Sequence, residues 1–420
     1  SMDADAVLTV GGGADGFDIL HVLGTEEADT AFETTATTVT RDGTVTIGAG
    51  IAQLNLSSFG GDDLVTLGAL TIPTQVDAGA GADTVNAAAV LTASVTIVGG
   101  PGNDNLTGGS STDVIRGGTG NDNITGGPSN DALQGGDATD VFFHDVGDGS
   151  DTIDGGDGDD VLFITGDATA NTISLTTNLT ATIATIDTDA IFNANVEGLV
   201  INAGNGADTI TAADVTDRSI ALVTLDLGTD ADTDAVTLEA TEGADDVSIT
   251  ETGGIVSAVG LAAQFDISSA TTADTLTVNG NAGDDVIKAL DGVEATIAIT
   301  LDGGEGNDTL SADAVIFGGA GDDTLIGGSG DDTLHGGAGD DILDGRGGDD
   351  EINGDAGTDT ILVSGTSAGE TLSVDHSAAT TLILSGGLSG GTETIDSIEA
   401  VRVEAGDGDD DIDITLLAAG

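Results

Sequence analysis

Two runs of nine-residue units decide the architecture of this chain. From Gly99 the sequence reads GGPGNDNLT, GGSSTDVIR, GGTGNDNIT, GGPSNDALQ and GGDATDVFF, and after His144 and Asp145 it continues with VGDGSDTID and GGDGDDVLF. The second run begins with GGEGNDTLS at Gly303 and, after six further residues, continues with GGAGDDTLI, GGSGDDTLH, GGAGDDILD, GRGGDDEIN and GDAGTDTIL, ending at Leu362. A short fixed period of this kind indicates a solenoid, in which each repeat packs mainly on its neighbours.

Each position of the unit has a physical role. Glycines at positions one, two and four suit a turn whose backbone requires positive φ. An aliphatic residue or Phe at position eight suits a short strand with one side chain in the core. One unit then forms a turn and a strand, and two units form a closed rung. Position-six Asp residues of alternate units should therefore stack on one edge, and the expected pairs are Asp104 over Asp122, Asp113 over Asp131, Asp323 over Asp341 and Asp332 over Asp350.

Stacked carboxylates require a cation. Neighbouring strands lie about 4.8 Å apart, and two carboxylates at that distance repel by roughly 3.5 kcal/mol at an effective dielectric constant of about 20. Calcium accepts roughly six to eight oxygen ligands in flexible geometry, whereas magnesium requires a stricter octahedron. The chain has no Cys and only four His, so soft metals lack ligands. The sequence predicts several bound calcium ions.

The predicted metal-binding residues form two groups. The carboxylates are those at position six: Asp104, Asp113, Asp122, Asp131, Asp140, Asp151, Asp160, Asp308, Asp323, Asp332, Asp341, Asp350 and Asp359. The glycines are those that preserve the turn at position four: Gly102, Gly120, Gly321, Gly330, Gly339, Gly348 and Gly357.

Some units depart from the pattern. Position four is occupied by Ser111, Ser129 and Ala138, and position two by Arg346 and Asp355. If position four needs positive φ, a side chain there strains the turn. Both serines lie on the edge of Asp113 and Asp131, so this edge is expected to bind calcium less well than the edge of Asp104, Asp122 and Asp140.

The unit resembles the RTX, or haemolysin-type, calcium-binding repeat, G-G-x-G-x-D-x-U-x with U aliphatic. Tandem matches cover 99–163 and 303–362, and single copies begin at Gly13, Ala78, Ala203 and Ala405. The resemblance implies a right-handed parallel β-roll in which position-six Asp and backbone carbonyls hold calcium in the turns. It also implies an extracellular or cell-surface bacterial protein, secreted by the type I route. The single copies are expected to lack a stacked partner.

The stretches between the runs alternate apolar and small polar residues, as in LTASVTIV at 91–98, which is typical of strands. A longer, loosely spaced arrangement begins at Gly24, Gly166, Gly243 and Gly365. We interpret its copies as rungs with longer coils in one all-β elongated rod, with β-sandwich inserts as the alternative. The expected divisions are 1–98, 99–163, 164–302, 303–362 and 363–420. Because repeats still run at Ile412, the chain is expected to be part of a longer protein.

Composition restricts the partners. The chain has 75 acidic and 6 basic residues, a formal net charge of -69, and Lys288 as its only lysine. Nucleic acids and anionic membrane surfaces require basic patches, so neither is expected to bind. No stretch approaches the roughly 20 apolar residues of a membrane helix. Calcium ions are the one predicted partner, and the sequence identifies none for self-association or attachment to a cell surface.

The candidate catalytic motifs lack the surroundings that their chemistry requires. G-x-S-x-G occurs at 365–369 and 387–391, but neither segment has the following helix that a nucleophile elbow needs. His21, His144, His335 and His376 are too dispersed for a zinc site, and paired carboxylates recur in nearly every unit. We therefore expect a non-catalytic, calcium-dependent structural or spacer module of a large secreted or cell-surface protein, of the surface-layer or adhesin-like kind. The alternative is the calcium-dependent tail of a secreted protease, lipase or polysaccharide epimerase.

Overall fold

The computed structural model describes residues 51–177, 182–213, 220–348 and 350–364, and short strands on either side of them. The chain divides into two compact units. Unit 1 contains residues 1–205 and 217–224, and unit 2 contains 206–216 and 225–420. The regular secondary structure of the described residues consists of strands and one 3-10 helix, η1, at Val293–Ala295. None of the helices in this part of the chain is long and apolar enough to span a membrane.

In unit 1, successive strands fall into two sheets. Sheet A contains β1 (Val7–Val10), β3 (Phe32–Thr35), β4 (Thr38–Thr40), β5 (Thr44–Ile47), β7 (Leu64–Thr66), β9 (Thr84–Asn86), β11 (Asn105–Thr107), β13 (Asn123–Thr125), β15 (Val141–Asp145), β17 (Val161–Thr165) and β21 (Gly198–Asn202). Sheet B contains β2 (Asp18–Thr25), β6 (Ile51–Phe59), β8 (Thr74–Asp77), β10 (Val95–Pro101), β12 (Val114–Thr119), β14 (Ala132–Asp137), β16 (Thr152–Asp157), β18 (Thr172–Thr177), β19 (Thr182–Ile186) and β20 (Asp189–Ala194).

Unit 2 has the same organisation, and β23 (Leu222–Asp226) has residues in both units. Its sheet A contains β25 (Asp246–Thr252), β26 (Ile255–Val259), β27 (Gln264–Ser268), β29 (Val286–Ala289), β31 (Thr309–Ser311), β33 (Thr324–Ile326), β35 (Ile342–Asp344), β37 (Thr360–Ser364) and β41 (Ala400–Glu404). Its sheet B contains β22 (Thr209–Ala212), β24 (Ala235–Glu239), β28 (Thr275–Asn279), β30 (Ala298–Glu305), β32 (Val315–Ala320), β34 (Thr333–Ala338), β36 (Glu351–Ala356), β38 (Thr371–Ala378), β39 (Thr381–Ser385), β40 (Thr392–Asp396) and β42 (Asp411–Leu416).

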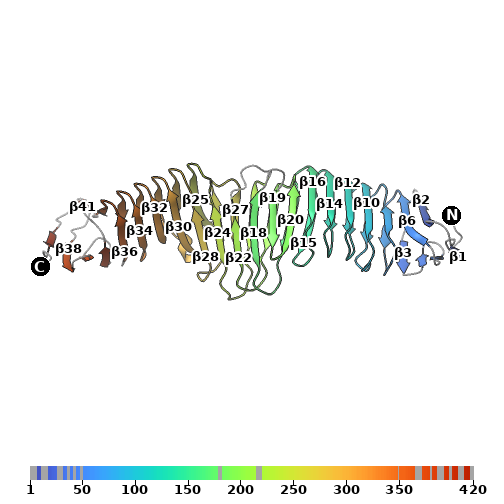
Figure 1. Cartoon of the computed structure of the whole chain (residues 1–420), viewed down its shortest axis with the longest axis horizontal. Coiled ribbons are helices and arrows are strands. Elements are labelled where there is room, and N and C mark those ends of the chain that lie inside the picture. The colour runs from blue at the N-terminus through green and yellow to red at the C-terminus, as the bar shows by residue number, and fades with distance from the viewer. Residues whose placement is uncertain are drawn as a thin grey trace. The chain divides into compact units, whose positions relative to one another are not determined.

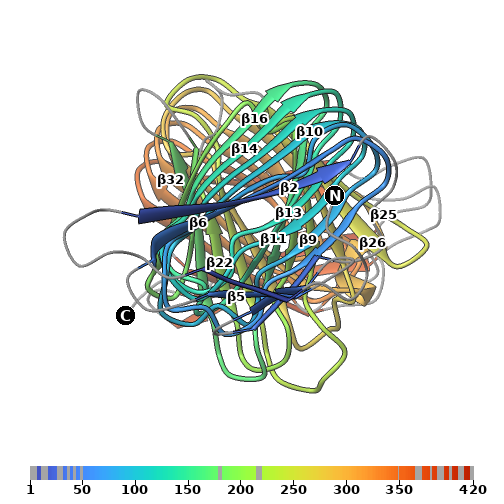
Figure 2. The same ribbon diagram turned by 90° about the vertical axis from the view of Figure 1, so that its right-hand side faces the viewer.

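The strand register confirms that two nine-residue units form one rung. β10, β12, β14 and β16 run side by side and parallel (Figure 1), while β9, β11 and β13 form a second layer facing them (Figure 2). Ile97 pairs with Ile115, and Leu106 with Ile124. These position-eight side chains are fully buried between the sheets. The predicted all-β parallel solenoid is therefore confirmed within each unit.

The longer arrangement is not built from longer coils. β19 runs antiparallel to both β18 and β20, and β20 returns to pair in parallel with β16. The same antiparallel triplet occurs as β3–β4–β5, β25–β26–β27 and β38–β39–β40. The expectation of coils is corrected: the additional residues form strands that belong to the two sheets. A tight hairpin explains one reversal, because Gly253 and Gly254, between β25 and β26, both have positive φ.

Several predicted features lie outside the described residues. These are the two G-x-S-x-G segments at 365–369 and 387–391, the start of the long arrangement at Gly365, and the turns that begin at Gly13 and Ala405.

Candidate metal centres

The position-six carboxylates form hydrogen-bonded ladders along the turns of unit 1. The backbone N–H of Asp104 donates to Oδ1 of Asp122 at 2.8 Å, that of Asp122 to Asp140 at 2.8 Å, and that of Asp140 to Asp160 at 2.7 Å. All four side chains are buried. The ladder confirms the predicted stacking and places each carboxylate against the backbone of its neighbour.

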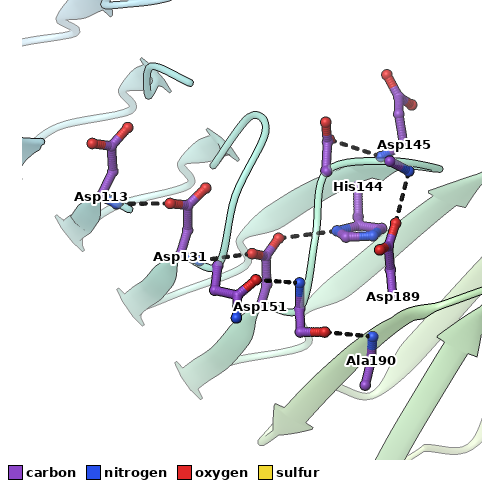
Figure 3. A network of polar contacts seen from close by, with 11 residues as sticks. Asp113, Asp131, His144, Asp145, Asp151, Asp189 and Ala190 are labelled. Atoms are coloured by element: carbon purple, nitrogen blue, oxygen red, sulfur yellow. Dashed lines mark hydrogen bonds and ion pairs between the residues drawn. The ribbon is translucent and has the colours of Figure 1, made fainter. Parts of the chain in front are cut away.

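The opposite edge of unit 1 repeats this arrangement. Asp113 N–H donates to Asp131 Oδ1 at 2.7 Å, and Asp131 N–H donates to Asp151 Oδ1 at 2.8 Å (Figure 3).

Unit 2 carries corresponding ladders. On one edge the donor–acceptor pairs are Asp308 to Asp323 at 2.8 Å, Asp323 to Asp341 at 2.8 Å and Asp341 to Asp359 at 3.0 Å. On the other edge Asp332 donates to Asp350 at 2.9 Å. The residues predicted to stack are thus brought together in both units.

The ladders are longer than the sequence indicated. In unit 1 they include Asp63 and Asp83, which lead to Asp104. In unit 2 they include two further series, Asp208–Asp234–Asp274 and Asp245–Asp285–Asp308. The turns beginning at Ala78 and Ala203 therefore do have stacked partners, and the expectation that they lacked them was wrong. The signal was present, because both copies keep Gly at position four and Asp at position six.

The second oxygen of many of these carboxylates has no hydrogen-bond donor. Buried Oδ2 atoms of this kind belong to Asp83, Asp104, Asp122, Asp131, Asp140, Asp160, Asp285, Asp308, Asp323 and Asp341. An anionic oxygen removed from water without a partner is strongly unfavourable. Hard, anionic oxygens of this type are the ligands that calcium prefers. The unpartnered oxygens therefore fit the predicted ion.

Backbone carbonyl oxygens converge on the same space. A Cβ atom added to Gly117 would stand 2.1 Å from Asp122 Oδ2 and 2.8 Å from the carbonyl oxygen of Gly135 on the next rung. Position-one glycines with the same surroundings are Gly99, Gly135, Gly303 and Gly336. None of these has positive φ, so the expectation for position one is corrected: glycine is needed there for space.

A metal ion in these turns would need both side-chain and backbone oxygens as ligands. Among the described residues, no group of three or more His, Asp or Glu side chains is arranged to hold a metal by itself. Calcium would therefore be held by a position-six carboxylate together with turn carbonyls, and its charge would neutralise the stacked row. This donor set contains oxygen only, which favours calcium over soft metals.

Within the nine-residue units, positive φ is confined to positions two and four, and not every copy has it. Gly321, Gly339 and Gly348 adopt φ between 134° and 142°. Gly330 and Gly357 do not have positive φ, although both are glycines at position four. Conversely, positive φ occurs at residues with side chains: Ser129 (104°), Ala138 (81°), Arg346 (61°) and Asp355 (62°). Ser111 does not adopt it, so the turn conformation depends on more than the presence of glycine.

Burial raises the pKa of Asp122, Asp131 and Asp323, three carboxyl groups inside the ladders. It is the largest cause of the shift, which brings the pKa of Asp131 to about 8 and those of Asp122 and Asp323 to about 7. Accepted backbone N–H groups lower these pKa values, while neighbouring ladder carboxylates raise them. Near neutral pH the metal-free ladders therefore compete for protons, which is a second sign that a cation is required.

A second ladder, formed by position-five side chains, was missed by sequence reasoning. In unit 2, Asp284 Oδ1 accepts the N–H of Asn307, and the series continues from Asn307 to Asp322, Asp340 and Thr358 at 2.7–2.9 Å. In unit 1, Asn103 Oδ1 accepts the N–H of Asn121 at 2.9 Å. These exposed oxygens accept from the following rung, whereas position-six oxygens accept from the preceding one. Together the two ladders fix the register of successive turns.

A parallel β-solenoid with rows of buried carboxylates in its turns has the architecture of a calcium-binding repeat protein. Comparison with known families supports this class, because residues 96–124, 116–148, 145–168, 277–293, 300–314, 315–343 and 326–361 match the family RTX calcium-binding nonapeptide repeat (4 copies). The chain thus carries RTX calcium-binding repeats, and the match at 277–293 precedes the run that begins at Gly303. A search of curated proteins found no match.

Proposed function

We propose that this chain is a calcium-dependent, non-catalytic structural module of a large secreted or cell-surface bacterial protein, of the surface-layer or adhesin-like kind. The observation that supports it most is that buried, unpartnered carboxylate oxygens recur from rung to rung in both units. A metal requirement spread along the whole fold is typical of a structural role. The paired carboxylates recur as well, so none of them has the unique setting that a catalytic pair requires.

Calcium binding and folding are coupled in this proposal. Ordering the backbone costs about 1–2 kcal/mol per residue, and the stacked carboxylates oppose closure of the turns until a cation neutralises them. Extracellular calcium modules bind with dissociation constants of about 10⁻⁴–10⁻³ M, so the chain would stay unfolded in a calcium-poor cytosol. It would fold after secretion, because the ligand set exists only in the folded state.

Resistance to proteolysis tests this function. In about 1 mM calcium, we expect a protease that needs no calcium to leave the ladder regions intact. In the same concentration of magnesium, or in chelator, the protease should digest them. Similar digestion in calcium and in chelator would contradict the proposal.

A separate test concerns the role as a spacer. Any polypeptide that flanks this chain in its natural protein should contain further repeats or surface-attachment segments. A catalytic domain there would instead favour the calcium-dependent tail of a secreted enzyme.

A further inference from the structure

The carboxylates that begin two of the ladders differ from those inside them. Asp113 accepts the N–H of Val95 at Oδ1 and that of Gly109 at Oδ2. Asp332 accepts the N–H of Ala314 at Oδ1 and that of Gly328 at Oδ2, both at 2.6 Å. Both oxygens of each carboxylate are thus satisfied by the backbone, whereas the Oδ2 atoms of the interior residues are not.

The reason lies in the preceding rung. A Cβ atom on Gly109 would meet the carbonyl oxygen of Val90 at 2.6 Å, and one on Gly328 would meet the side chain of Asp313. Inside a ladder, the position-two glycine instead lies over another glycine turn, as Gly118 lies over Gly100. Neither Gly109 nor Gly328 has positive φ, whereas Gly118 has φ 130°. Where no glycine turn lies beneath it, the first turn adopts another backbone conformation, and its position-two N–H binds the carboxylate.

The last carboxylates of two series are also satisfied, those of Asp113–Asp131–Asp151 and of Asp208–Asp234–Asp274. Asp151 Oδ2 lies 3.0 Å from Nδ1 of His144, and both residues are buried (Figure 3). Asp274 Oδ2 accepts the N–H of Thr271 at 2.7 Å and its hydroxyl at 3.0 Å.

The first carboxylate of another series also has hydrogen-bond donors at its Oδ2 atom. Asp245, which begins the series through Asp285, accepts the N–H and hydroxyl of Thr241 at Oδ2 at 2.9 and 2.7 Å.

From this contrast we infer that these ladder ends are closed by the protein itself. The cap residues, which bind no calcium, are Asp113, Asp151, Asp245, Asp274 and Asp332, and calcium is held at the interior carboxylates between them. The inference rests on the proposed calcium function and refines it. On the edge of Asp113, Asp131 and Asp151, only Asp131 then has an open oxygen. The opposite edge includes the open oxygens of Asp83, Asp104, Asp122, Asp140 and Asp160.

Matched Asp→Asn substitutions in the full chain test the caps. Asn keeps Oδ1 as an acceptor for the ladder N–H but replaces the second oxygen by an amide that cannot accept or bind calcium. Native mass spectrometry in calcium should show that Asp131→Asn and Asp323→Asn each lose one ion or more. Asp113→Asn and Asp332→Asn should retain the wild-type number of ions, with a lower thermal midpoint because one backbone N–H loses its acceptor.

The outcomes distinguish a failure of the cap assignment from a failure of the proposed calcium function. Equal ion loss from the cap and interior variants would overturn the cap assignment while leaving calcium binding intact. Wild-type protein that binds no calcium would overturn the proposed function itself. Each unit contributes one cap variant and one interior variant, so the pair in one unit decides the question if a variant in the other fails to fold.

Discussion

Acidification should fold the calcium-free chain. In chelator, lowering the pH from about 8 to about 5 is expected to increase the strand signal in circular dichroism. Burial raises the pKa of Asp131 to about 8 and those of Asp122 and Asp323 to about 7, from an ordinary value of 3.8. A carboxyl group with a higher pKa in the folded chain binds protons more readily there, so protonation favours folding.

Because the folded-state pKa values are raised, protonation stabilises the calcium-free folded chain only at lower pH. The stabilisation is complete below the unfolded pKa near 3.8 and is lost as the pH rises through about 7–8. A pH of about 5 lies inside this window and above the isoelectric point of about 4.1, so the chain keeps a negative charge. Calcium provides the control: in its presence, acidification should weaken ion binding, because protons compete for the same oxygens. A chelated chain that is equally unfolded at both pH values would contradict this explanation.

Adding a single methyl group at position one should distort the turn and destabilise the folded chain. In Gly117→Ala, the new Cβ atom would stand 2.1 Å from Asp122 Oδ2 and 2.8 Å from the Gly135 carbonyl oxygen. Both oxygens must move, and both belong to the candidate metal centre. We expect destabilisation of about 2–4 kcal/mol from overpacking and lost oxygen contacts. The calcium concentration needed for folding should rise several-fold.

Gly243→Ala is the matched control. The nearest atom to its added Cβ is the Thr241 hydroxyl oxygen at 3.7 Å, and Gly243 does not have positive φ. Its effect should stay within about 0.5 kcal/mol. Calcium titrations and thermal unfolding of the two variants give the comparison, and equal effects would show that position one does not serve the metal centre.

The sequence allowed the period, the core and the stacking to be predicted. An inward Leu or Ile at position eight and an Asp at position six recur with the same spacing, and a solenoid turns that spacing into vertical rows. Leu106 over Ile124 and Asp104 over Asp122 follow directly. The period could be extended to single copies such as the one containing Asp83, because stacking requires only that the next turn lie beneath.

Other features depend on contacts that spacing does not encode. The need for glycine at Gly117 comes from Asp122 and from the carbonyl of the next rung, so the turn's own φ does not explain it. The different setting of Asp113 comes from the segment near Val90 on the previous rung. One of the antiparallel triplets has a local sequence signal. The Gly253–Gly254 pair lies between two alternating stretches, which favours a hairpin. The return of the triplets to the parallel sheets depends on tertiary pairing.

Whether the carboxylate ladders need calcium to fold can be measured by a calcium titration of the metal-free chain, followed by far-ultraviolet circular dichroism at low salt and neutral pH. We expect little strand signal in chelator and a cooperative gain of strand signal at calcium concentrations of about 10⁻⁴–10⁻³ M. Magnesium at the same concentrations should give little change. Full strand signal in excess chelator would contradict the claim that the carboxylate ladders need calcium to fold.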